Sequence, residues 1–556
     1  MKLRLIVASV FVLSTAALAK PAQAPSVSAP QLSQPLLEEM VRTLSSDAFE
    51  GRAPSTPGGE ERTVPYLIEK FKAAGLQPGN PGGSNGGWTQ DVPTVEITAE
   101  HPSGLAITGG AKTMLFAYGK DFVAGSYRIT ERTEITDAEL VFVGYGINAP
   151  ELGWNDYAGV DMKGKIAVIL VNDPDYATEG EVGPFKGRRM TYYGRWTYKF
   201  EEAARQGAAG ALIVHDTFPA AYGWNVVESS WTGAQYFVAR DNNGMDQTVA
   251  NGWIQKPVAE AILSAAGQNL DTLSAAAKQK GFKPVPLGLK GSLGFDNQVR
   301  RAMSHNVIGI LPGKKRPDEY VLYTAHWDHL GRCKADATGD DICNGALDNA
   351  SGTAMLTALA EANVKAGAAD RSQVFLAVTL EESGLLGSEY YAQNPVYPLS
   401  KTVGGVNMDG VGPGPGSRDV SVTGGDKSEL TRTLTAVLAT MQLRQSPEKY
   451  PERGSYYRSD HFSLAKRGVP MFSLGLGSDW IEGGTAAGQA WGDTYTRANY
   501  HQPSDEYDGK WDWRAPLQAG ELYYRLGRGL AMSRDWPNWH PGDEFRAVRD
   551  ASRSGK

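Results

Sequence analysis

Two adjacent glutamates, Glu381 and Glu382, end an apolar run in the segment AVTLEESGLLGSEYY. Like charges side by side in a half-buried place cost free energy unless a cation compensates them. A solvated strand end is the plain structural explanation of such a pair. The pair indicates chemistry only if the chain brings other residues of suitable types beside it.

Four more residues of suitable types stand at comparable places in the sequence. EYVLYTA runs directly into His326, and TVGGVNM runs into Asp409. Asp348 precedes a predicted helix, and His501 lies in the loop NYHQPSDEYD. Each residue alone has an ordinary explanation as a surface histidine, a helix cap or a turn. Together at consecutive strand ends, imidazoles and carboxylates without thiolates suit Zn²⁺ in a hydrolytic site.

Asp328 stands two residues after His326, in the sequence HWDH. A metal-bound imidazole needs an acceptor for its second N–H group. We therefore expect the Asp328 carboxylate to accept this N–H group and so to hold and orient the ring of His326.

The elements that must position these residues follow from the sequence periodicity. From residue 306 onward, apolar strands alternate with helical segments, which is typical of an α/β layered fold around a largely parallel sheet. In such folds functional groups gather at the carboxyl ends of the strands. Residues 36–74 read as helices broken by a glycine-rich turn. Residues 138–289 have a different texture, with the strands AELVFVGYGI and GKIAVILVND and a helix–strand unit in KFEEAARQGAAGALIVHD.

Length and composition narrow the class of protein. The chain has 556 residues, which predicts more than one domain, and a net charge of −7, which gives no basic excess for binding nucleic acid. The N-terminus has Lys2 and Arg4, an apolar run to Leu18 and a small-residue cleavage pattern, which together predict a secretory signal peptide. We expect no membrane span in the mature chain, and a periplasmic or extracellular location.

The two cysteines, Cys333 and Cys343, lie in one short stretch between His326 and Asp348. In an exported protein, a close pair indicates a disulfide rather than a metal site. We expect the bridge to constrain the segment that joins two candidate metal ligands.

The motifs HWDHLG, NGALDNASG, EESGLLGSEYY, NMDG and YHQPSDE occur in this order. With them the chain resembles the family of co-catalytic di-zinc aminopeptidases, which also contains glutamate carboxypeptidases and glutaminyl cyclases. The resemblance implies a three-layer α/β fold with a mixed, mostly parallel central sheet and two zinc ions per chain. The middle region resembles the protease-associated domain that several members carry as a β-rich insertion.

The resemblance also implies roles for individual residues. His326 and Asp409 match ligands of one zinc, Glu382 and His501 match ligands of the other, and Asp348 matches the bridging carboxylate. The remaining implied roles are a general base at Glu381, supporting contacts from Asp328 and Asp505, an oxyanion contact from Tyr500, a site-lining or structural place for His461, and a cis peptide bond between Asp348 and Asn349.

These roles imply an exported metallo-aminopeptidase that acts on peptides with a free N-terminus. Two metal ions would activate a water that Glu381 deprotonates. The alternatives are a dipeptidase, a carboxypeptidase or a glutaminyl cyclase with the same site, and a non-catalytic receptor-like binding protein. Oligomeric state is left open. The predicted segments are a signal peptide (1–19), a linker (20–35), the peptidase domain in two parts (36–130 and 296–545), the insertion (131–295) and a flexible tail (546–556).

Overall fold

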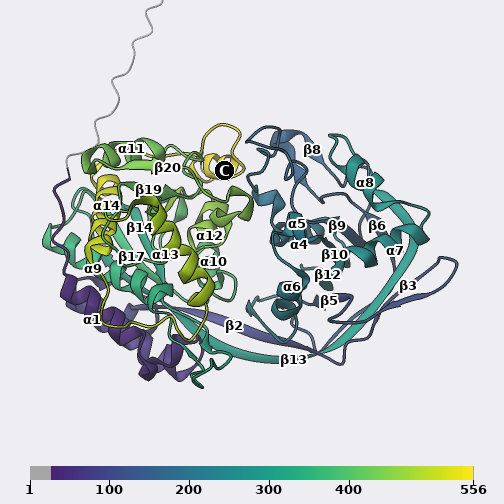
Figure 1. Cartoon of the computed structure of the whole chain (residues 1–556), viewed down its shortest axis with the longest axis horizontal. Coiled ribbons are helices and arrows are strands. Elements are labelled where there is room, and N and C mark those ends of the chain that lie inside the picture. Colours follow the sequence, from purple (N-terminus) through teal and green to yellow (C-terminus); the bar gives the residue numbers. More distant parts are fainter. Residues whose placement is uncertain (1–26, 555–556) are drawn as a thin grey trace, which may run out of the picture.

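The computed structural model describes residues 27–554, which form two lobes side by side (Figure 1). The large lobe contains residues 27–100 and 296–554, and the inserted lobe contains residues 101–295. The predicted signal peptide, 1–19, lies outside the described residues. Within the described part of the chain, no helix is both long enough and apolar enough to cross a membrane.

A mixed sheet forms the centre of the large lobe. Four of its strands, β17, β14, β18 and β21, run parallel, and the end of β13 pairs antiparallel with β17. The predicted α/β fold with a mostly parallel sheet is therefore confirmed. In spatial order the strands are β1 (Gln77–Pro78), β13 (Val285–Leu311), β17 (Arg371–Val378), β14 (Arg316–His326), β18 (Thr402–Asn407), β21 (Met471–Leu476), β19 (Asp419–Val422) and β20 (Arg444–Ser446).

Helices cover both faces of this sheet, which gives three layers. One face buries its apolar side chains in a large core with the first group of helices, and the other face packs in a smaller core with two short helices. The first group is α1 (Gln34–Leu44), α2 (Val64–Ala73), α9 (Gly352–Lys365), α11 (Leu430–Met441) and α14 (Arg514–Met532), and the second is α10 (Leu386–Gln393) and α12 (His461–Lys466).

The inserted lobe has a sheet and cores of its own. Its strands β6 (Arg132–Phe142), β9 (Ile166–Leu170), β10 (Gly210–His215) and β12 (Ala250–Gln255) are parallel, and β5 (Phe122–Gly125) pairs antiparallel with β12. Its helices are α4 (Trp196–Arg205), α5 (Thr217–Ala220), α6 (Trp224–Trp231), α7 (Lys256–Ala265) and α8 (Leu270–Ala277).

The predicted start of the insertion at residue 131 is wrong. Strands β3 (Leu105–Thr108), β4 (Met114–Phe116) and β5 come before that boundary but belong to the inserted lobe. Phe122 and Leu105 lie in its core, because β5 pairs with β12 and β3 pairs with the first half of β13. These short strands carry no local signal of the lobe they join, so the sequence placed them with the preceding helices.

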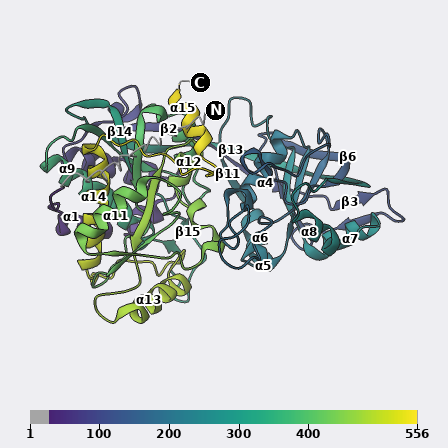
Figure 2. The ribbon, with the colours of Figure 1, turned by 90° about the horizontal axis from the view of Figure 1, so that it is seen from above.

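A two-stranded ribbon joins the lobes. Strand β2 (Thr89–Glu100) pairs antiparallel with β13 along its whole length: Thr89 lies opposite Val307, and Glu100 lies opposite Asp296. Figure 1 shows both strands running beneath the two lobes. In Figure 2 the lobes lie next to each other, with α13 (Gly484–Ala498) at the margin of the large lobe. Strand β11 (Ala234–Val238) of the inserted lobe adds to the ribbon along β2.

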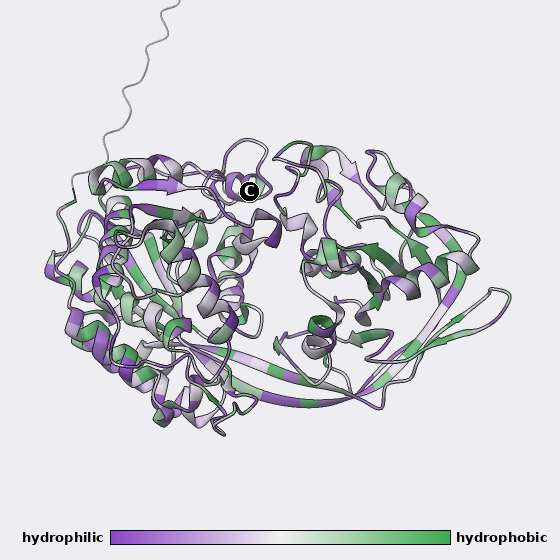
Figure 3. Cartoon of the chain, in the orientation of Figure 1, coloured by the Kyte–Doolittle hydropathy of each residue, from purple (hydrophilic) through white to green (hydrophobic). Residues whose placement is uncertain are grey.

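Apolar residues concentrate on the central strands of both lobes, as Figure 3 shows in green. The predicted flexible tail is wrong, because residues Arg546–Ser554 form helix α15. Its Arg549 is buried and donates hydrogen bonds to the carbonyl oxygens of Thr402 and Val403 at 2.9 and 3.1 Å. A buried cation with several acceptors holds this polar helix on the lobe.

Candidate metal centre

The parallel arrangement of β14, β17 and β18 brings three candidate residues to one edge of the sheet. His326 is the last residue of β14, Glu381 follows β17, and Asp409 follows β18. Their ligand atoms lie within 4.8 Å of one another. The juxtaposition follows from the sheet, because carboxyl ends of neighbouring parallel strands meet at one edge.

Asp348 lies between the two predicted histidines. His326 Nε2 is 3.4 Å from Asp348 Oδ1 and 3.3 Å from Asp409 Oδ1. On the other side, His501 Nε2 is 3.3 Å from Asp348 Oδ2 and 3.2 Å from Glu382 Oε2. Asp348 thus presents one oxygen to each imidazole, and the five predicted metal ligands form two groups that share it.

A sharp turn separates the directions of Glu381 and Glu382. Leu380 is buried and has φ +56°, a left-handed conformation that is uncommon for a residue with a side chain. The turn is held by the carboxylate of Asp328, which accepts hydrogen bonds from the backbone N–H groups of Glu381 and Glu382 at 3.1 and 3.4 Å.

Asp328 was expected to orient His326 through its carboxylate. The closest contact of His326 Nδ1 is instead the backbone carbonyl oxygen of Asp328, at 3.2 Å, and Asp328 Oδ1 is 3.8 Å away. The carboxylate is turned toward the glutamate turn, where it accepts two N–H groups. Asp328 therefore supports both strand ends, with its backbone on one side and its side chain on the other.

Asp505 holds the loop that carries Asp348. Its carboxylate accepts hydrogen bonds from the backbone N–H groups of Leu347 and Asp348 at 3.0 and 3.1 Å. The hydroxyl of Tyr495 donates to Asp505 at 3.1 Å. The peptide bond between Asp348 and Asn349 is cis, as expected. The Asn349 amide donates to the carbonyl oxygen of Met408 at 3.1 Å, which ties this loop to the end of β18.

Three residues that the sequence did not single out lie at or next to the centre, and two of them bond to candidate ligands. Ser459 donates a hydrogen bond to Asp409 Oδ2 at 2.6 Å, and His329 Nδ1 donates to Glu382 Oε1 at 2.7 Å. Asp460 is fully buried, and neither of its carboxylate oxygens has a hydrogen-bond partner among the described residues. His329 follows His326 in the same motif, which was its only signal in the sequence.

Arg52 is the fourth missed residue. Its guanidinium group is fully buried and donates to the carbonyl oxygens of Trp327, Asn344 and Gly345 at 2.9, 2.6 and 2.9 Å. A further bond reaches the carbonyl oxygen of Leu44 at 2.7 Å. Arg52 thus ties the loop after His326 to the loop before Asp348.

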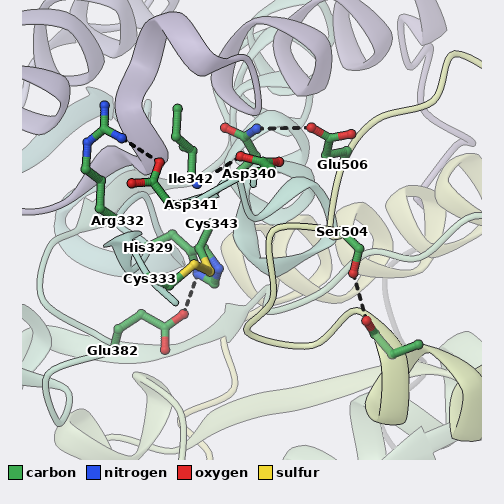
Figure 4. The surroundings of a disulfide bond; sticks show 12 residues. His329, Arg332, Cys333, Asp340, Asp341, Ile342, Cys343, Glu382, Ser504 and Glu506 are labelled. Atoms are coloured by element: carbon green, nitrogen blue, oxygen red, sulfur yellow. Dashed lines mark hydrogen bonds and ion pairs between the residues drawn. A yellow bond between two sulfur atoms is a disulfide. The ribbon is translucent and has the colours of Figure 1, made fainter. Parts of the chain in front are cut away.

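The predicted disulfide between Cys333 and Cys343 is present, with a Cα–Cα distance of 5.9 Å. Figure 4 draws it together with His329, which is hydrogen-bonded to Glu382. Gly51, next to Arg52, has φ +63°, and a Cβ there would lie 2.6 Å from the carbonyl oxygen of Cys343. Only glycine allows the chain to pass so close to the bridged loop.

The buried carboxylates of the centre need cations to balance their negative charge. Burial raises the pKa of Glu381 well above its usual range, and the charges of Asp409 and Glu382 raise it further. Burial likewise raises the pKa of Asp328 and that of Asp460 to about 7. So many buried carboxylates are unfavourable without compensating positive charge.

The donor set fits zinc. His501 Nε2 is buried and makes no aligned hydrogen bond, although two carboxylate oxygens lie within 3.3 Å. A nitrogen and oxygens that converge without hydrogen-bond alignment are arranged as ligands of a common ion. Zinc accepts imidazole and carboxylate ligands of this kind. His326, Asp348 and Asp409 would hold one ion, and Asp348, Glu382 and His501 the other.

Two further predicted residues are Tyr500, which is partly exposed, and His461, which is buried. The ring of Tyr500 stacks on His501 with centroids 3.8 Å apart, and the residue is 46% exposed. His461 is fully buried, with its ring edge-on to Tyr456 at 4.7 Å and neither ring nitrogen hydrogen-bonded within the described chain. Of the two places considered for His461, the packed structural one agrees with this contact. The oxyanion role of Tyr500 stays a prediction.

Comparisons with known proteins add a family context. Residues 306–526 match the profile described as Peptidase family M28. The chain is 31% identical over 289 residues to leupeptin-inactivating enzyme 1 of Streptomyces exfoliatus, which covers 49% of this chain and 60% of that protein. It is 29% identical over 250 residues to aminopeptidase YwaD of Bacillus subtilis, covering 43% and 46%.

A shorter match of 138 residues, 31% identical, links the chain to the mouse aminopeptidase NAALADL1, over 23% of this chain and 17% of that one. The chain thus spans less than two thirds of the length of these curated relatives. Among solved structures, an aminopeptidase from Aneurinibacillus sp. strain AM-1 superposes with a TM-score of 0.48 at 21% identity, over 91% of this chain and 95% of that one.

Proposed function

We propose that this protein is a zinc metallopeptidase that removes the N-terminal residue of peptides. The proposal starts from the match of residues 306–526 to the profile of Peptidase family M28. The observation that carries the proposal is the arrangement around Asp348. One oxygen of this carboxylate faces His326 and the other faces His501, at 3.4 and 3.3 Å. A shared carboxylate between two ligand groups supports a pair of metal ions rather than one.

The chain supplies the remaining chemistry. Zinc at such a centre acts as a Lewis acid and makes water a better nucleophile near neutral pH. The ligand atoms of Glu381, His326 and Asp409 lie within 4.8 Å of one another, whereas His501 lies beside Asp348 and Glu382. Because Glu381 stands beside His326 and Asp409, we assign it the proton transfer: it accepts the proton of the attacking water and returns it to the leaving amine. Asp328 fixes the Glu381 backbone for this transfer.

The excess of carboxylates also supports the choice of the N-terminal bond. A substrate with a free α-amino group would bring a positive charge to this carboxylate-lined centre. A peptide with a blocked N-terminus lacks that charge. We therefore expect unblocked peptides to be the substrates and N-acetylated peptides to be poor ones.

The decisive experiment is the variant Glu381→Gln. We expect it to keep zinc by mass spectrometry and to lose about 10²–10⁴ of kcat on aminoacyl nitroanilides, the usual contribution of a positioned general base. Glu482→Gln is the control, because Glu482 is an exposed glutamate of the same lobe that pairs with Arg514. Near-normal turnover by Glu381→Gln would refute the base assignment, and a chain that binds no zinc in excess metal would refute the function.

A second candidate, left open by the sequence, is a peptidase that binds the C-terminal carboxylate of its substrate, and Arg458, next to Ser459 at the metal centre, is the residue to test for it. Segments 188–195 and 451–458 of the two lobes pack together, with Met190 N–H donating to the Pro451 carbonyl oxygen at 3.2 Å. Arg195 and Arg458 lie at the ends of these segments, and within the described chain neither side chain contacts a carboxylate. Burial and the charge of Arg458 lower the pKa of Arg195 to about 10.

Comparing dipeptides with their C-terminal amides separates the two candidates. If the carboxylate is read, the free acids are better substrates, and Arg458→Gln removes that preference while amides are unaffected. Arg467→Gln, an exposed arginine paired with Glu389, is the control. Equal rates on acids and amides would favour the aminopeptidase without this contact.

A further inference from the structure

A cavity of about 590 Å³ lies beside α13. Its volume is in the range of about 300–1,000 Å³ that is typical of small-molecule sites. Figure 2 shows α13 at the margin of the large lobe. The lining is aromatic and acidic, with Trp480, Trp491, Tyr495 and Trp511 on one hand and Asp505, Glu506, Asp508 and Asp512 on the other.

The aromatic wall is built by the spacing of α13. Gly488, Trp491 and Tyr495 are three and four residues apart, so they share one face of the helix. A Cβ at Gly488 would lie 2.2 Å from the carbonyl oxygen of Ser478, so glycine lets the helix sit close to that loop. The rings of Trp491 and Tyr495 stack at 5.8 Å, and Trp480 lies 5.9 Å from Trp491.

The opposite wall is held by backbone hydrogen bonds. Gly414 N–H donates to the Asp512 carbonyl oxygen at 2.9 Å, and Ala515 N–H donates to the Gly414 carbonyl oxygen at 2.8 Å. Both walls are therefore fixed before any ligand arrives. A preformed site loses little conformational entropy on binding.

The charges of the lining are uneven. Four carboxylates face a single cation, Lys510. Asp512 is paired with Arg514 at 2.6 Å, and Asp505 accepts three hydrogen bonds. Glu506 and Asp508 have no cationic partner among the described residues, so two carboxylates remain available for a positive ligand.

We propose that this cavity binds a small organic cation through an ammonium or guanidinium group. The ring faces of Trp480 and Trp491 attract a cation by their quadrupoles, most strongly when the cation is desolvated. Glu506 and Asp508 supply the counter-charge. A neutral ligand of the same shape lacks the attraction to the tryptophan rings and to the two carboxylates, and the carboxylates repel an anion.

The cavity shares a wall with the metal centre. Leu347 and Asp505 line the cavity, and Asp505 also accepts the backbone N–H of Asp348 at 3.1 Å. The cation has two sources, a free small molecule or the basic side chain of a peptide substrate, and the second source rests on the proposed function. The binding experiment below needs no turnover, so it stands if the proposed function fails.

The first test measures binding of choline to the zinc-loaded full chain by titration calorimetry. Choline has no amine that can ligate zinc, and 3,3-dimethylbutan-1-ol is its neutral isostere. We expect choline to bind at least about tenfold more tightly than the isostere. Trp491→Leu and the double variant Glu506→Gln, Asp508→Asn should each weaken choline binding about tenfold. Asp493→Asn, an exposed change elsewhere on α13, should leave it unchanged.

The second test identifies the source. It compares kcat/KM for lysine and leucine nitroanilides in the wild type and in Trp491→Leu. A selective loss with lysine assigns the cavity to a substrate side chain, whereas an unchanged ratio together with choline binding assigns it to a free cation. The proposal is overturned if choline and its isostere bind equally, or if neither binds and the lysine-to-leucine ratio is unchanged.

Discussion

Replacing Arg52 by methionine should destabilise the large lobe and disable the metal centre. The guanidinium group lies 0% exposed and donates to four carbonyl oxygens, those of Leu44, Trp327, Asn344 and Gly345. Two of these belong to the loop before Asp348, and one belongs to the loop after His326. Methionine keeps the length of the side chain and removes every donor.

The magnitude follows from the acceptors left behind. A buried acceptor that loses its partner costs about 1–3 kcal/mol, so four set an upper bound of about 12 kcal/mol. Water that enters the space, and a shift of the loop, would give some of these carbonyl oxygens new hydrogen-bond donors and so reduce the cost. We therefore expect the free energy of unfolding of the large lobe to fall by about 3–5 kcal/mol, a fraction of that bound. Arg52→Lys keeps three donors, so its free energy of unfolding should lie between those of the wild type and Arg52→Met.

The assay combines urea denaturation of the zinc-loaded chain with zinc content and kcat/KM. The matched control is Arg62→Met, because Arg62 lies in the same segment but pairs with Glu50 at the surface, 44% and 40% exposed. Such a surface pair contributes about 0–1 kcal/mol. An Arg52→Met chain with the urea midpoint and activity of the control would refute the positioning argument.

Three further predictions concern the surroundings of the centre. Replacing both Cys333 and Cys343 by serine opens a loop with a sequence separation of 10 and should cost about 3 kcal/mol, measured as a shifted urea midpoint that reductant also produces in the wild type. Ser459→Ala removes the 2.6 Å bond to Asp409 and the acceptor of the Asn407 amide at 2.7 Å, and should lower kcat/KM about tenfold to a hundredfold; unchanged kinetics would contradict it. Burial lowers the pKa of His461 to about 3, so the unfolded chain binds a proton below about pH 6.5 that the folded chain refuses, and stability falls as pH drops from about 6.5 toward 3, by up to about 1.4 kcal/mol per pH unit. His461→Leu should remove that part of the acid sensitivity, and identical pH–stability curves for variant and wild type would show the assignment to be wrong.

Much of the large lobe was predictable because its signals are local. Strand β17 and the glutamates after it lie in one continuous stretch, and so do β14 with His326 and β18 with Asp409. An apolar run followed by a polar ligand is visible in about ten residues of sequence. The cis bond at Asp348–Asn349 and the disulfide were also expected from short motifs.

The missed features depend on contacts between distant parts of the chain. Arg52 meets Trp327 across 275 residues, and Ser459 meets Asp409 across 50. Strands β3 and β5 were assigned to the wrong domain because their partners, β13 and β12, come more than a hundred residues later. No periodicity in a short segment reports which distant segment it joins.

The sequence by itself determined the types of the ligands, their order and the strands that end in them, because residue identity and strand periodicity are properties of short segments. Only the tertiary structure decided that one carboxylate, Asp348, lies between two imidazoles, that the Asp328 side chain turns toward the glutamate turn, and that Glu506 and Asp508 face a wall of tryptophans. These relations arise when parallel strands and helices pack, since packing alone sets the distances between residues that are far apart along the chain.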